Sequence, residues 1–221
     1  MCTPVNIYFV STARGTYHHG DLRNALLHAG AELAESGGPD AVTIRAAARI
    51  AGVTPTAAYR HFADHAELLD AVRQLAMERL SAAMTRYLRR PPAASDRTAA
   101  AVNRLHSTGR GYIHFAVTEP GLFRTAFFTG KDDASATHQP AGSGPFDMLC
   151  AALDGLVEVG YLDAEDRPLA EFAAWSAVHG LALLLIDGPL RALPRREREA
   201  VIDRALDVVE RGLATGRPAR K

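Results

Sequence analysis

The chain has 221 residues with 25 basic and 25 acidic side chains, so its formal net charge at pH 7 is zero. This balance argues against tight non-specific binding to nucleic acid, because phosphate neutralisation dominates that affinity. Cys2 and Cys150 form neither a disulfide framework nor a metal-binding pattern. The longest apolar segment, residues 172–186, is too short to span a membrane. We therefore expect a cytoplasmic protein without a membrane partner.

The first half of the chain begins with a predicted flexible arm, residues 1–16. Abundant alanine, 7% aromatic residues and few alternating runs of Val, Ile and Thr favour an all-α fold. A helix is predicted from Gly20 to Ser36, where its apolar face ends before two glycines and a proline. This helix is expected to brace two shorter helices that follow it.

Residues 43–62 carry the signals of a helix-turn-helix motif. Thr43 can cap a short helix, and Gly52 permits the left-handed turn that a tight connection requires. Thr54 then caps a second helix, in which Pro55 occupies the first position. The second helix buries one face and presents small, hydroxyl and cationic groups on the other, a pattern that suits the major groove of DNA.

The outward-facing residues of this motif are the predicted DNA contacts, although each one alone fits an ordinary solvated helix position. Thr56 and Ala57 are expected to meet base edges. Tyr59 and His61 are expected to contact phosphates, as are Thr43 and Arg45 at the preceding helix. The complete set from this reasoning is Thr43, Arg45, Thr54, Thr56, Ala57, Tyr59 and His61.

Metal binding by this motif is not expected. His61 and His65 have the four-residue spacing of helical metal ligands, but the helix boundary at Asp64 separates them. No phosphate-binding glycine loop is present in the sequence either, so we predict neither a metal nor a cofactor.

A longer helical part follows the motif and completes a fold of about nine helices. One helix is predicted from Asp64 to Leu88, and a polar loop is predicted at residues 131–145. Residues 17–80 are assigned to the motif-bearing domain and residues 81–221 to a C-terminal domain. The other helices are predicted at 98–118, 122–129, 145–159, 168–187 and 195–213.

The C-terminal domain concentrates aromatic and imidazole side chains that could hold a small molecule. An apolar pocket with one or two polar groups is the usual form of such a site, and His114 or His179 could be the polar group. The alternative is that these residues form an ordinary core with hydrogen-bonded histidines. The candidate ligand-binding residues are Tyr112, His114, Phe115, Phe123, Phe127, Trp175 and His179.

The last two predicted helices carry more apolar residues than one subunit is expected to bury. Phe172, Val178 and Leu185 belong to the first of them, and Val201 and Val208 to the second. The surplus favours a homodimer through these two helices, whereas the alternative is a central helix of a single subunit.

Several motifs together resemble the DNA-binding domain of TetR-type transcriptional regulators. They are residues 17–23 (YHHGDLR), 52–55 (GVTP), 59–62 (YRHF) and 67–69 (ELL). Residues 175–180 (WSAVHG) resemble the Trp-His-Gly signature of one subgroup. Two positions depart from the family pattern: His65 stands where many members have a phosphate-binding Lys, and Thr56 stands where Gly is common.

The resemblance implies an all-helical homodimer whose C-terminal ligand alters its affinity for a palindromic DNA operator. It also adds His65 to the expected DNA contacts. We therefore predict a sequence-specific repressor, and not an enzyme, that a small, largely apolar effector releases from DNA. The alternatives are an all-helical enzyme that binds a small molecule and a DNA-architectural protein without a ligand.

Overall fold

The computed structural model describes residues 19–128 and 144–214, which fold into nine α-helices and two short 3-10 helices without a strand. This confirms the predicted all-α class. The predicted arm at 1–16 and residues 131–143 of the predicted loop lie outside the described residues. The helices are α1 (His19–Gly37), α2 (Ile44–Ile50), α3 (Pro55–Ala58), α4 (His65–Leu88), α5 (Arg97–Thr118), α6 (Pro120–Ala126), α7 (Pro145–Glu158), α8 (Ala170–Ile186) and α9 (Arg195–Leu213), with η1 (Pro39–Ala41) and η2 (Pro189–Ala192) between them.

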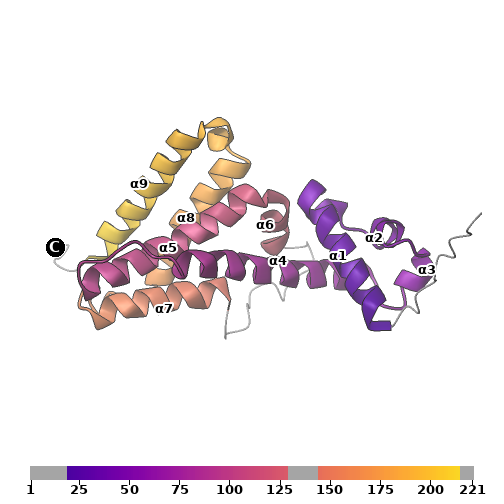
Figure 1. Ribbon diagram of the computed structural model, residues 1–221, viewed down its shortest axis with the longest axis horizontal. Helices are drawn as coiled ribbons and strands as arrows, with labels where there is room; N and C mark the ends of the chain where they lie inside the picture. Colours follow the sequence, from indigo (N-terminus) through magenta and orange to yellow (C-terminus); the bar gives the residue numbers. More distant parts are fainter. Residues whose placement is uncertain (1–18, 129–143, 215–221) are drawn as a thin grey trace, which may run out of the picture.

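The described chain is elongated (Figure 1). Helices α1, α2 and α3 gather at one end, and α5, α7, α8 and α9 form a larger bundle at the other. Helix α4 runs along both parts and packs against α1, α5 and α6. Among the described helices, none has the length and apolar character needed to cross a bilayer.

The small N-terminal unit is organised by caps that the sequence specifies locally. The Thr43 hydroxyl accepts a hydrogen bond from the Ala46 N–H at 3.1 Å, and the Thr54 hydroxyl accepts one from the Ala57 N–H at 3.2 Å. Gly52 has a φ of 69°, which the turn between α2 and α3 requires. These contacts confirm the predicted starts of both helices.

Helix α4 begins with a reciprocal cap and joins the two parts of the molecule. Asp64 accepts a hydrogen bond from the Glu67 N–H at 2.9 Å, and Glu67 accepts one from the Ala63 N–H at 2.7 Å. Val72 and Met84, in the first and second halves of α4, are buried in the same hydrophobic cluster. The predicted domain boundary after residue 80 falls inside this continuous helix and stays a prediction.

Two helix boundaries differ from the sequence-based prediction for a physical reason. The α-helical part of α3 ends at Ala58. Hydrogen-bonded turns then continue to Phe62, as in the bond from the His61 N–H to the Ala58 carbonyl oxygen at 2.9 Å. Helix α6 begins at Pro120, two residues before the predicted start at 122, because the missing N–H of a proline costs nothing at the first helical position.

Most apolar residues of α8 that were predicted to face a partner are buried in the core of the subunit. Val178, Leu181 and Leu185 are buried, so the predicted surplus does not come from them. Phe172, by contrast, is 48% exposed, and Val208 of α9 is 57% exposed. Of the predicted surplus, Phe172 and Val208 therefore remain on the outward surface of these helices.

Candidate nucleic-acid interface and internal cavity

The helix-turn-helix unit presents a polar surface over an apolar support. Thr56 is exposed, and Tyr59 is 49% exposed at the end of α3. Behind them, Ala58 and Phe62 are buried, and the Arg23 guanidinium lies 4.5 Å from the centre of the Phe62 ring. The support holds the exposed residues at fixed positions relative to α1, as a docking surface requires.

The other predicted contacts are distributed around this surface. Thr43, Arg45 and Thr54 are exposed, whereas Ala57 and His61 are half-buried. The hydroxyl oxygens of Thr43 and Thr54 already accept backbone hydrogen bonds, but each O–H can still donate one to a phosphate oxygen. The structure thus brings the predicted residues to one end of the molecule, and their role in DNA binding stays a prediction.

His65 makes a contact that its sequence position did not reveal. Its Nε2 lies 2.7 Å from the Val42 carbonyl oxygen, so this nitrogen carries a hydrogen and donates it. The remaining Nδ1 of a neutral ring is an acceptor and cannot bind a phosphate oxygen. A phosphate contact by His65 therefore requires a protonated ring or a different rotamer.

The bundle contains a buried aromatic cluster organised by one phenol. Trp175 donates its indole N–H to the Tyr112 hydroxyl at 3.1 Å, and that hydroxyl lies 2.8 Å from Nδ1 of His179. Burial raises the pKa of Tyr112 well above its usual value and lowers the pKa of His179. Both groups are therefore neutral at pH 7, and the phenol donates its hydrogen to Nδ1 of the imidazole.

Two small cavities flank this cluster, and Tyr112 and Trp175 line both of them. One is lined by residues of α4, α5, α7, α8 and α9 and holds about 30 Å³, with an almost entirely apolar wall. The other also holds about 30 Å³ and is closed by Phe127 and Phe146. Each has room for one water-sized molecule, far less than the roughly 300–1,000 Å³ of a drug-sized site.

The predicted ligand-binding residues fall into three groups around these cavities. Tyr112, Phe127 and Trp175 line them, and His179 contacts their wall through Tyr112. Phe115 and Phe123 are fully buried core residues. His114 is exposed, and its ring centre lies 5.5 Å from that of Tyr87, away from the cavities.

Sequence reasoning missed several residues of the cavity walls. Leu149 lines both cavities and Phe146 lines the second, and both belong to α7. His106 on α5 lines the first cavity. No local pattern marks these positions, because neighbouring helices complete the walls.

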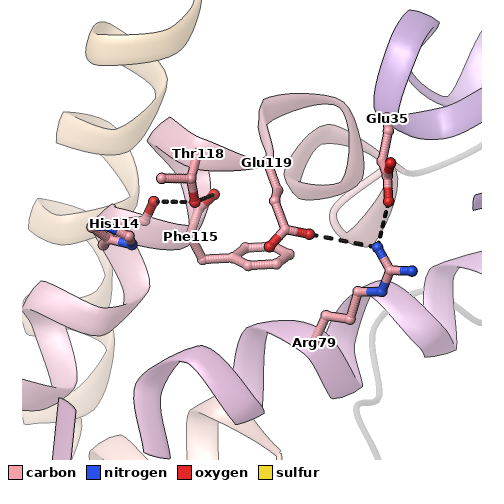
Figure 2. A network of polar contacts seen from close by, with 6 residues as sticks. All are labelled: Glu35, Arg79, His114, Phe115, Thr118 and Glu119. Carbon is pink, nitrogen blue, oxygen red and sulfur yellow. Dashed lines mark hydrogen bonds and ion pairs between the residues drawn. The ribbon is translucent and has the colours of Figure 1, made fainter. Parts of the chain in front are cut away.

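A polar network connects the bundle to the N-terminal unit (Figure 2). Arg79 of α4 pairs with Glu35 of α1, and its Nη1 also lies 3.6 Å from a carboxylate oxygen of Glu119 at the start of α6. Beside it, Gly121 lies against the last turns of α1: a Cβ added there would be 2.1 Å from the Ala34 carbonyl oxygen. Helices α1, α4 and α6 are therefore in close contact at one point.

The far end of α6 is fixed to α8. Arg124 donates from Nε and Nη2 to the Asp187 carboxylate at 2.9 and 2.5 Å, and this pair lowers the pKa of Asp187. A bidentate pair of this kind restrains orientation as well as distance. A movement of the C-terminal end of α8 would thus be passed to α6.

Comparisons with known proteins bear on both halves of the chain. Residues 26–72 match the family model described as bacterial regulatory proteins, tetR family, and residues 105–209 match the model described as Tetracyclin repressor-like, C-terminal domain. None of the proteins with curated descriptions matches the sequence.

Solved structures share the fold over most of the chain. A protein of unknown function from Rhodococcus sp. RHA1 is 27% identical, with a TM-score of 0.73, over 91% of this chain and 100% of its own. A TetR family transcription regulator from Marinobacter aquaeolei VT8 is 19% identical, with a TM-score of 0.59, over 87% of this chain and 95% of its own. Another from Thermus thermophilus is 22% identical, with a TM-score of 0.54, over 88% and 98%. Since the two family models together match well over half of its residues, the chain belongs to the TetR family of bacterial transcription regulators.

Proposed function

We propose that the protein is a dimeric repressor that a small, neutral and largely apolar effector releases from a palindromic operator. The observation that carries this proposal is the exposed face of α3, with Thr56 and Tyr59 outward and Ala58 and Phe62 buried behind it. Thr56 and Ala57 would meet base edges in the major groove. As a regulator of bacterial transcription, the protein would act in the cytoplasm.

The remaining predicted contacts would fix the register of the protein on the DNA backbone. Arg45 is exposed at the start of α2 and would bind a phosphate directly. The Thr43 and Thr54 hydroxyls would each donate one hydrogen bond, and Tyr59 would do the same with its phenol. Because the chain has no net charge, these few contacts would give a shallow dependence of affinity on salt.

The dimer is proposed to form through a stripe on α8 and a matching stripe on α9. Ala177, Gly180 and Leu184 lie on one face of α8, and no atom lies within 4 Å of a Cβ added at Gly180. Val201 and Val208 lie on one face of α9, which packs beside α8. Small and apolar residues at this spacing permit a second pair of helices to approach closely, as an isologous four-helix interface requires.

The effector is proposed to bind where the two cavities meet at Tyr112 and Trp175. The two polar groups at this point, Tyr112 and His179, are neutral, because burial suppresses both ionisation of the phenol and protonation of the imidazole. A charged effector would therefore lose its hydration without gaining a counter-ion. The proposed class is an uncharged apolar molecule with one polar group for the phenol or the imidazole.

Release from DNA would follow because the cavities are too small for such a molecule. Binding must displace a wall, and a movement of α8 would reach α6 through Arg124 and Asp187. Helix α6 contacts α1 at Gly121, so the N-terminal unit would change its angle to the bundle. A tilt of about 5° along the 24-residue α4 would move its far end by about 3 Å, given a rise of about 1.5 Å per residue.

The experiment that tests the proposal begins with selection of operator fragments from genomic DNA. Replacing Thr56 and Tyr59 by Ala should weaken operator binding by about 5- to 150-fold, from contacts worth roughly 1–3 kcal/mol. Glu32→Ala, an exposed change on α1, is the matched control and should bind like the wild type. Full operator affinity of the double variant would refute the proposed surface, and equal affinity of the wild type for all sequences would favour an architectural role.

A further inference from the structure

The contact between α5 and α9 contains more acidic than basic side chains. Arg110 of α5 pairs with Asp203 of α9, and its Nη1 lies 3.6 Å from a Glu199 carboxylate oxygen. One turn along α5, His106 lies 3.0 Å from Glu210, again through Nε2 and a carboxylate oxygen. At this contact three carboxylates thus lie beside one arginine and one histidine.

A third side chain completes a compact group at His106. Asp207 contributes a carboxylate oxygen that lies within 4.8 Å of both a ring nitrogen of His106 and an oxygen of Glu210. Within the described ranges 19–128 and 144–214, the carboxylate of Asp207 makes no hydrogen bond and no ion pair. Its half-buried carboxylate therefore lies beside the His106–Glu210 pair without a polar partner in these parts of the chain.

One separation in this group equals that of two ligands on the same metal ion. Two atoms bound to the same ion at about 2.1 Å are about 3.0–3.4 Å apart in octahedral or tetrahedral geometry. The 3.0 Å between His106 and Glu210 already has this value. The oxygen of Asp207 lies within 4.8 Å of both atoms, so its side chain would move closer to them to bind the same ion.

Tyr161 supplies the orientation that a metal-binding carboxylate needs. Its hydroxyl donates to Oε1 of Glu210 at 2.6 Å and leaves Oε2 directed at His106. Outer hydrogen bonds of this kind commonly fix the ligands of metal sites.

We propose that His106, Asp207 and Glu210 bind a divalent transition-metal cation, with Zn²⁺ as the best match. One imidazole nitrogen with two carboxylate oxygens is a donor set for zinc, whereas Mg²⁺ and Ca²⁺ prefer oxygen alone. All three side chains are half-buried, so an ion and its remaining water ligands can reach them.

The ion would link α5, which carries His106, to α9, which carries Asp207 and Glu210. His106 also lines the apolar cavity beside Tyr112, and Leu206 of α9 lines it from the other side. A bound ion would hold these two walls together and restrain their separation. The site does not depend on DNA binding or on an effector, so its test is independent of the proposed function.

The test uses the full-length protein, treated with a chelator and then titrated with Zn²⁺. We expect a site that Asp207→Asn and His106→Gln each weaken about tenfold or more, because even outer-shell losses cost 10- to 100-fold. His114→Gln is the matched control, since His114 is an exposed histidine on the same helix. Titration with Mg²⁺ in place of Zn²⁺ should show no binding at this site.

Thermal unfolding gives a second measurement on the same proteins. Zn²⁺ should raise the unfolding midpoint of the wild type and of His114→Gln, but not that of Asp207→Asn. If His106→Gln does not fold, Asp207→Asn alone tests the site. This variant should fold, because the Asp207 carboxylate makes no polar contact in the described part of the chain that the substitution would remove. Equal zinc affinity of the wild type and Asp207→Asn, or an equal rise of both midpoints, would overturn the proposal.

Discussion

The contact between α6 and α1 can be tested by adding one methyl group, with Gly121→Ala. The new Cβ would lie 2.1 Å from the Ala34 carbonyl oxygen and 2.6 Å from that of Glu35. Both are backbone atoms, so no rotamer change relieves the clash, and α6 must move away by about 1 Å to restore ordinary contact. Overpacking of this kind costs about 1–3 kcal/mol, against at most about 1 kcal/mol gained from alanine in a helix.

Urea unfolding of Gly121→Ala should therefore give a free energy of unfolding about 1–2 kcal/mol below that of the wild type. Gly155→Ala is the matched control: no atom lies within 4 Å of its added Cβ on α7, so it should stabilise by about 0.5–1 kcal/mol. Operator affinity, measured by fluorescence anisotropy, should change in Gly121→Ala and not in Gly155→Ala. If Gly121→Ala were as stable as Gly155→Ala, then α6 would not be held against α1 and this coupling route would be wrong.

Three further changes have defined outcomes. Burial lowers the pKa of His179, so the unfolded chain takes up that proton first, and the free energy of unfolding should fall as the pH drops below about 6.5. His179→Gln should remove part of this decline in a urea series from pH 7.5 to 5, and an unchanged slope would exclude His179 as its source. The Phe62 side chain is 1% exposed, so Phe62→Ala should lower the free energy of unfolding in urea by about 3–5 kcal/mol and abolish operator binding. A decrease below about 1 kcal/mol would contradict the place of Phe62 in the core. Asp64→Ala removes the acceptor for the Glu67 N–H and should lower the free energy of unfolding by about 0.5–2 kcal/mol. Asp64→Asn keeps an acceptor, so it should lower this free energy by less.

The N-terminal unit could be predicted because its signals act over a few residues. A hydroxyl at Thr43 or Thr54 caps the backbone N–H three positions later, and Asp64 does the same for α4. These contacts depend on local backbone geometry, which the sequence encodes without reference to distant parts of the chain. The starts of α2, α3 and α4 were therefore correctly placed.

The cavity was harder to predict because its walls come from distant segments. Tyr112 meets Trp175 and His179 through hydrogen bonds across more than sixty residues of sequence. Helical geometry could still have refined the candidate list: at about 100° per residue, His114 lies about 200° around α5 from Tyr112. The two side chains therefore point in nearly opposite directions, as the exposure of His114 shows.

The ion pairs at Arg79 have a strength suited to a regulated contact. Arg79 is 35% exposed, and exposed pairs of this kind contribute at most about 1 kcal/mol each. Useful coupling between an effector and DNA requires only about 1–3 kcal/mol. A displaced α6 could thus give up the Glu119 contact at a cost within the reach of a small ligand, while Glu35 keeps Arg79 on α1. Steric repulsion between Gly121 and the backbone of α1 would transmit the movement of α6, and the weak ion pairs at Arg79 would determine its free-energy cost.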